Sequence, residues 1–224
     1  MRPLTFAVPK PLLAVGGRPI LQHILERLHA SGFTETIMAT GYLAELIAAF
    51  CGDGSRFGLK IRYVSEPRPL GTAGPVSLCR AFIDDDEFFL LMNGDILTDL
   101  DFAHLVEFAR KNDFDLTVGY VHHTYKSPFG VLQVEGNEVL TVVEKPETTF
   151  PISAGIYVLK ATVLDLIPPD TYFTVPDLME ALRAKGRRVG AYHIEGMWRG
   201  LESLDHIAEA DAQLEARPPE SPSR

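Results

Sequence analysis

This 224-residue sequence lacks long apolar runs, a cysteine framework and an excess of positive charge. No apolar run approaches the roughly 20 residues of a membrane-spanning helix. No basic stretch leads into an apolar segment at its start, so we expect neither a membrane partner nor a secretion signal. The formal net charge of −9 disfavours nucleic acid as a partner, although a local basic pocket for phosphates is compatible with it.

Cysteine is nearly absent. Cys51 and Cys79 are the only two, too few for a disulfide framework or a zinc site. Free cysteines are commonly buried, so we expect two partly buried thiols in a cytoplasmic protein. The remaining composition, with 46% hydrophobic and 23% charged residues, is typical of a globular protein, and the length favours one large domain.

Helical and strand patterns alternate along the chain. Apolar residues at helical spacing predict helices over residues 20–28, 43–50, 101–111, 175–185 and 203–215, and shorter ones over 74–82 and 161–166. Alternating or wholly apolar runs predict strands over residues 36–40, 60–64, 88–92, 115–121, 153–159 and 188–194, and a hairpin over 130–144. This alternation predicts an α/β protein with a mostly parallel sheet. We expect one domain over residues 1–215 and a disordered tail, rich in Pro and Ser, over 216–224.

Two short motifs suit phosphate groups. The Pro-Lys-Pro motif fixes the backbone around Lys10, whose ammonium can serve as a point charge for phosphate. The alternative is a surface lysine in a turn. The Asn-Gly-Asp motif ends at Asp95, after an apolar strand. Ligands of open α/β sheets bind at the carboxyl ends of strands, and a carboxylate there suits Mg²⁺ held with nucleotide phosphates. The alternative is an aspartate that ends the strand in a turn.

Three further motifs are compatible with binding or with plain structure. The loop of residues 69–74 has two glycines, which let backbone approach a flat ligand or simply form a turn. Glu144 and Lys145 follow a strand and can bind a sugar hydroxyl and a phosphate, or form a solvated pair that contributes little. Glu202 is the first carboxylate after Trp198, the only tryptophan. It suits either a second metal site or the start of a helix.

In this order the motifs closely resemble those of the sugar-1-phosphate nucleotidylyltransferases, from the N-terminus to about residue 210. The elements PKP, PLGTAG, NGD, FGV (for the more usual YGV), EKP and AGIY all occur in order and at the expected spacing. The resemblance implies a Rossmann-like three-layer α/β/α fold with a mostly parallel mixed sheet. It implies transfer of a nucleotidyl group from a nucleoside triphosphate to a sugar-1-phosphate, with Mg²⁺ as cofactor.

The resemblance also implies roles for individual residues. Lys10 would contact the substrate phosphates, and Asp95 would hold Mg²⁺. The residues that would hold the base are Glu66, Gly71, Thr72, Ala73 and Gly74. The residues that would hold the sugar phosphate are Gly130, Glu144, Lys145 and Gly155.

Two features depart from the family's pattern. The family opens with an apolar strand and a glycine-rich loop, G-G-x-G-T-R-L, which wraps the triphosphate, whereas this sequence begins just after them. Without that strand, the strands at residues 36–40 and 88–92 would face a gap with unpaired backbone. We therefore hypothesise that the natural chain extends upstream of Met1. In addition, Gly200 stands where a second metal-binding aspartate is usual, and Glu202 is the candidate substitute.

Two other functions stay open. One is an inactive paralogue that binds a nucleotide sugar and regulates a partner. The other is a glycosyltransferase, but its acidic metal motif would have to be Asp84-Asp85-Asp86, which precedes a strand instead of following one. The sequence names neither the base nor the sugar, and the resemblance allows a homo-oligomer.

Overall fold

A computed structural model describes residues 4–84 and 87–215 of the chain. The tail expected over residues 216–224 lies outside the described residues. The α-helices are α1 (Ile20–Ala30), α2 (Ala44–Cys51), α3 (Phe102–Asn112), α4 (Val175–Ala184) and α5 (Leu204–Glu215). The 3₁₀ helices are η1 (Leu4–Phe6), η2 (Lys10–Leu12), η3 (Ser55–Phe57), η4 (Gly74–Phe82) and η5 (Ala161–Leu166).

The largest sheet has four strands in the order β11 (Val189–His193), β7 (Leu116–Lys126), β10 (Glu147–Lys160) and β5 (Phe88–Met92). β7 is parallel to β11, and β10 is antiparallel to both β7 and β5. Three of its four strands therefore run in one direction, which confirms the expected mixed sheet, although two of its three pairings are antiparallel. The other pairs are β1 (Ala14–Val15) with β2 (Arg18–Pro19), β3 (Glu35–Thr40) with β4 (Lys60–Ser65), β6 (Ile96–Thr98) with β12 (Trp198–Gly200), and β8 (Val131–Glu135) with β9 (Glu138–Val143).

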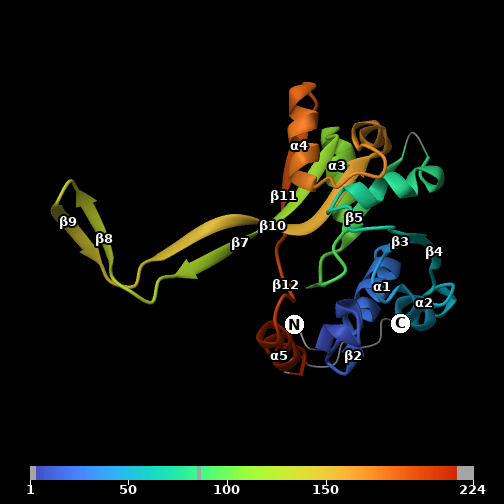
Figure 1. Ribbon diagram of the computed structural model, residues 1–224, viewed down its shortest axis with the longest axis horizontal. Coiled ribbons are helices and arrows are strands. Elements are labelled where there is room, and N and C mark those ends of the chain that lie inside the picture. Colours follow the sequence, from blue (N-terminus) through green and yellow to red (C-terminus); the bar gives the residue numbers. More distant parts are fainter. Residues whose placement is uncertain (1–3, 85–86, 216–224) are drawn as a thin grey trace.

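Helices cover both faces of this sheet (Figure 1). Successive side chains of a strand point to opposite faces, and β10 shows the consequence. Ile156 and Val158 belong to a buried cluster with α1 and α3, whereas Tyr157 and Leu159 belong to a second cluster with η5 and α4. These two cores give the expected three-layer arrangement.

Local signals explain where the main helices begin. Pro19 precedes α1, whose five buried residues repeat at the spacing of one helix face. The Asp101 carboxylate caps α3 by accepting a hydrogen bond from the amide of Ala103 at 2.9 Å. Thr174 and Asp177 form a reciprocal capping box at the start of α4.

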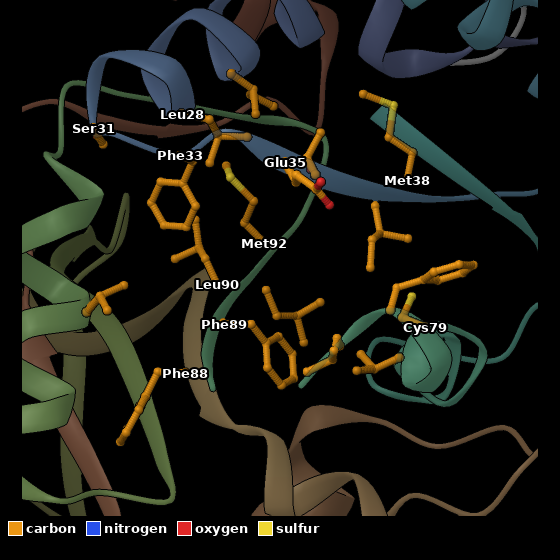
Figure 2. A pocket seen from close by; sticks show the side chains of 18 of the residues that line it. Leu28, Ser31, Phe33, Glu35, Met38, Cys79, Phe88, Phe89, Leu90 and Met92 are labelled. Atoms are coloured by element: carbon orange, nitrogen blue, oxygen red, sulfur yellow. The ribbon is translucent and has the colours of Figure 1, made fainter. Parts of the chain in front are cut away.

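The expected gap in the sheet is present. Among the described strands, β3 pairs only with β4, and β5 pairs only with β10. A cavity of about 1250 Å³ lies between the open edges of β3 and β5 and is also lined by α1, η4 and α3. Figure 2 shows Glu35 and Met38 of β3 on one side of it and Leu90 and Met92 of β5 on the other. We expected β5 to be covered on both faces, but every one of its residues stays partly exposed because of this cavity.

A long two-stranded ribbon leaves the body of the molecule (Figure 1). β7 and β10 extend well past the strands predicted at residues 115–121 and 153–159, and they continue into the hairpin of β8 and β9. We call residues 122–152 the arm. Its side chains are almost all exposed, so the arm has no packed core of its own.

The short helices and strands differ in part from the sequence prediction, whereas the cysteines agree with it. Residues 74–82 and 161–166 form 3₁₀ helices, not α-helices, and the three-residue strands β6 and β12 were not predicted. Cys51 and Cys79 are free and buried, as expected, and burial raises the pKa of each thiol to about 11. Within the described ranges, no helix is long and apolar enough to cross a membrane.

Candidate functional site

Lys10 and Asp95, 85 positions apart in sequence, are in direct contact. The Lys10 ammonium donates a hydrogen bond to the Asp95 carboxylate, and each side chain is a little over one quarter exposed. Lys10 opens η2 after Pro9, and Asp95 lies in the turn that follows β5. The structure thus brings together the two residues predicted to serve the phosphates and the metal, at the carboxyl end of a strand.

Gly155 adjoins the turn that carries Asp95. Its carbonyl accepts a hydrogen bond from the amide of Asn93 at 3.0 Å. Its φ of +68° lies in the left-handed region, and a Cβ there would lie 2.7 Å from Asn93 Nδ2 and 2.7 Å from Ile96 Cδ1. The position requires glycine for both reasons. Gly155 therefore holds backbone against the Asn93–Asp95 turn, next to the Lys10–Asp95 pair.

The tryptophan segment lies beside the same turn. β12 pairs antiparallel with β6, and the amide of Leu201 donates to the Asp95 carbonyl at 3.0 Å. The Trp198 indole donates to the carbonyl of Ala154 at 2.9 Å, so this side chain has a positioning role that sequence reasoning missed. Glu202 follows Leu201 directly and is exposed, so it lies one residue from the backbone hydrogen bond to Asp95.

The loop of residues 69–74, which was predicted to hold the base, is hydrogen-bonded to the segment before α4. The amides of Ala73 and Gly74 both donate to the Phe173 carbonyl, at 2.9 and 2.8 Å. A Cβ on Gly71 would lie 2.6 Å from the same carbonyl oxygen. Close packing against Phe173 therefore requires glycine at position 71. Thr72 accepts a hydrogen bond from the Val175 amide. A nucleotide base therefore has two fewer amides available here than the sequence suggested.

Glu66 braces the start of this loop. Its carboxylate accepts a hydrogen bond from the amide of Leu70 at 3.2 Å, and its own amide donates to the carbonyl of Thr40 at the end of β3. Leu70 is fully buried. The loop is therefore a rigid junction between β4 and η4.

The remaining predicted residues lie on the arm, away from Asp95. A Cβ on Gly130 would approach a carboxylate oxygen of Glu144 to 3.0 Å, so these two are neighbours. Lys145 has a φ of +45°, an uncommon conformation for a residue with a side chain. The structure brings Gly130, Glu144 and Lys145 together, but it does not bring them to the Lys10–Asp95 pair.

The described residues contain no group of three or more His, Cys, Asp or Glu side chains suited to a metal ion. Mg²⁺ differs from most protein-bound metals because it is commonly held by one or two carboxylates together with substrate phosphates. Asp95 fits that arrangement, and Glu202 is a second candidate donor because it follows Leu201, whose amide donates to the Asp95 carbonyl.

Known proteins resemble this chain in sequence and fold. A family model described as nucleotidyl transferase matches residues 1–217. A mannose-1-phosphate guanylyltransferase from Mycobacterium tuberculosis is 35% identical over 219 residues, covering 96% of this chain and 61% of that protein. A probable mannose-1-phosphate guanylyltransferase 1 from Oryza sativa subsp. japonica is 38% identical over 175 residues, covering 75% and 48%.

The chain thus spans about half to three fifths of the length of these relatives. A crystal structure of HddC from Yersinia pseudotuberculosis shares its fold, with a TM-score of 0.72 and 23% identity, over 92% of this chain and 90% of that one. The match of the family model over nearly the whole chain confirms the resemblance read from the motifs. The chain belongs to the nucleotidyl transferase family, and the relatives that it resembles are named mannose-1-phosphate guanylyltransferases.

Proposed function

We propose that this protein transfers a nucleotidyl group from a nucleoside triphosphate to a sugar-1-phosphate. A phosphate oxygen of the sugar attacks the α-phosphorus, the α–β phosphoanhydride bond breaks, and pyrophosphate leaves. The contact between Lys10 and Asp95 at the end of β5 carries this proposal, because it pairs a cation for phosphate with a carboxylate for a metal in a chain of the nucleotidyl transferase family. Such a reaction depends on positioning and charge compensation.

Lys10 and Asp95 change partners when substrate binds, in this proposal. The Lys10 ammonium turns from Asp95 to the phosphates and offsets their negative charge. Asp95, with Glu202, would then hold Mg²⁺ together with those phosphates. The metal supplies charge stabilisation at the phosphoryl oxygens. The ion pair therefore keeps both groups in place before substrate arrives.

The base and the sugar would lie on either side of this pair. Glu66 and the backbone of residues 71–74 would face the base, with Phe173 fixing the loop. Gly155 would face the sugar through backbone, while Glu144 would bind its hydroxyls and Lys145 its phosphate. Since the relatives above are named mannose-1-phosphate guanylyltransferases, we propose GTP and mannose-1-phosphate as the first substrates to test.

We also propose that residues 1–215 form one domain that accepts one more strand. The cavity between β3 and β5 has two open strand edges and apolar walls, and backbone N–H and C=O groups at such edges require partners. An apolar strand ahead of residue 1 in a longer polypeptide would pair with both edges. The free thiols Cys51 and Cys79 suit a reducing compartment, so we propose a cytoplasmic enzyme whose nucleotide sugar serves polysaccharide synthesis.

An inactive, nucleotide-sugar-binding paralogue is the second candidate, because Gly200 provides no carboxylate where the family's pattern has one. A substrate panel separates the two. Four nucleoside triphosphates are combined with mannose- and glucose-1-phosphate in Mg²⁺, using this chain and a version extended upstream in its natural reading frame. We expect sugar-dependent pyrophosphate release and a nucleotide sugar detected by mass spectrometry. Turnover by neither version, with calorimetric binding of a nucleotide sugar, would establish the paralogue instead.

A further inference from the structure

Two histidines meet at the root of the arm. His122 is the first residue of the arm and belongs to β7, and His193 is the last residue of β11. Nδ1 of His122 and Nε2 of His193 are 3.1 Å apart and share a hydrogen bond. Both side chains are exposed, so ions in solution can reach them. Neither residue has a part in the proposed transfer reaction.

The strand register explains why these two rings meet. β11 runs parallel to β7, and His193 is the register partner of Tyr120. Tyr120 and His122 are two residues apart on β7, so their side chains point to the same face of the sheet as that of His193. The amide of Ile194 donates to the Tyr120 carbonyl at 2.8 Å. β7 continues beyond this point into the arm (Figure 1).

The Tyr120 ring holds both imidazoles in place. Its centroid lies 5.6 Å from that of His122 and 5.1 Å from that of His193, and the two imidazole centroids are 4.8 Å apart. The cross-strand neighbours are Tyr120 for His193 and Pro151 of β10 for His122. Neither neighbour carries a charge that would repel a cation. The two ring nitrogens are therefore positioned before a ligand arrives, which lowers the entropic cost of binding one.

The spacing of these nitrogens matches that of two ligands on one metal ion. Imidazole is a preferred ligand of zinc and related transition metals. Two zinc–nitrogen bonds of about 2.0–2.1 Å, at an angle of about 90–110°, place their nitrogens about 2.8–3.4 Å apart. The observed 3.1 Å lies within this range. The alternative is a plain hydrogen bond between two exposed rings, which has a similar length and contributes little in water.

We propose that His122 and His193 together bind Zn²⁺ at the root of the arm. The ring that donates the hydrogen bond changes tautomer, so its proton moves to its second nitrogen and both facing nitrogens present lone pairs to the metal. Water completes the coordination, since within the described ranges no third His, Cys, Asp or Glu joins them in a metal-binding group. Because one ligand belongs to the arm and the other to β11, the bound ion ties the arm to the body.

Calorimetric titration with zinc chloride tests the site on the full chain. His193→Gln removes one ligand. His123→Gln is the matched control, because His123 points to the face opposite His122 and its ring lies against Tyr125, with centroids 4.5 Å apart. All the substituted side chains are exposed, so both variants are expected to fold, which circular dichroism verifies. An excess of Mg²⁺, which prefers oxygen ligands, is present throughout to compete for carboxylates.

We expect the parent chain and His123→Gln to share a one-to-one zinc-binding step that His193→Gln loses. Equal zinc titrations of the three proteins would show an adventitious ion only and would overturn the site. The position of the ion is then read from modification of histidine rings by diethyl pyrocarbonate, followed by mass spectrometry. Zinc should protect His122 and His193 in the parent chain and leave His123 reactive. Equal protection of His123, or no protection of His122, would contradict the assigned ligands.

Amide hydrogen exchange tests the tie between the arm and the body. We expect saturating zinc to slow exchange at residues 121–125 of β7 in the parent chain and in His123→Gln, but not in His193→Gln. Unchanged exchange in the zinc-loaded parent chain would refute the tie. None of these measurements uses catalysis. An inactive enzyme would refute the proposed function, whereas the zinc titration, ring modification and amide exchange would still decide the metal site.

Discussion

Gly155→Ala tests how the backbone of β10 supports the Asp95 turn. Gly155 has a φ of +68°, and a Cβ would lie 2.7 Å from Ile96 Cδ1. The left-handed conformation costs an alanine about 1–2 kcal/mol. Because Ile96 is buried and has little room to move, overpacking adds about 1 kcal/mol. We expect a loss of about 2–3 kcal/mol in the free energy of unfolding, which lowers the Tm by roughly 4–12 °C in a chain of this size.

Gly17→Ala is the matched control, since Gly17 has a φ of +70° and a Cβ added to it would meet no atom within 4 Å. This variant carries the conformational cost without the clash. Thermal unfolding should therefore show Gly155→Ala as the less stable variant by about 1 kcal/mol. Pyrophosphate release should also fall further in Gly155→Ala, because the displaced Asn93 moves the turn that holds Asp95. Equal Tm values and equal rates in the two variants would refute this reasoning.

Three further predictions concern charge, burial and the sugar phosphate. The pKa of Asp115 is lowered, because hydrogen bonds from Arg187 and from the Arg188 amide outweigh the effect of burial. Its stabilisation is present above the unfolded-state pKa of about 3.9 and is lost as pH falls through the lower folded-state pKa. Asp115→Asn should therefore be less stable than the parent by about 2 kcal/mol at pH 7, and the difference should shrink as the pH falls through the folded-state pKa. A constant difference in Tm at all pH values would contradict this. Cys79 lines the cavity and has a pKa raised to about 11, so its alkylation at pH 7.5, followed by mass spectrometry, should be slow. If a strand fills the cavity in the upstream-extended chain, alkylation of Cys79 should be slower still in that chain. Equal alkylation rates in the two chains would argue against that strand. Lys145→Ala should raise the KM for sugar phosphate more than the KM for nucleotide, and equal increases in steady-state assays would exclude the assigned role.

Much of the fold was predictable because its signals are local. The apolar spacing after Pro19 predicted α1 within two residues of its end, and the wholly apolar run at residues 88–92 coincides with β5. The 3₁₀ helices were not distinguished from α-helices, because a segment as short as η5 does not separate the two periods. β6 and β12 have three residues each, too few for any periodic pattern to be recognised.

The positions of site residues were predictable where a motif follows directly on a strand. Contacts between segments that are far apart in the sequence were not predictable. The motif after β5 placed Asp95 correctly at a carboxyl edge, and Lys10 does meet it. No local signal indicated that the Phe173 carbonyl would take the amides of Ala73 and Gly74. The length of the arm was also missed, because the outer halves of β7 and β10 are polar and solvated on both faces. As a result, the separation of Lys145 from Asp95 emerges only from the three-dimensional structure.

Sugar-dependent pyrophosphate release by Asp95→Asn is the most direct test of the account. GTP, mannose-1-phosphate and Mg²⁺ are supplied at saturation to the parent enzyme, to Asp95→Asn and to Asp165→Asn, which changes a largely exposed carboxylate on η5. We predict that the parent and Asp165→Asn release pyrophosphate only when sugar phosphate is present, and that Asp95→Asn loses on the order of 10²-fold in rate. Near-parental turnover by a folded Asp95→Asn variant, or release without sugar phosphate, would contradict the proposed nucleotidyl transfer.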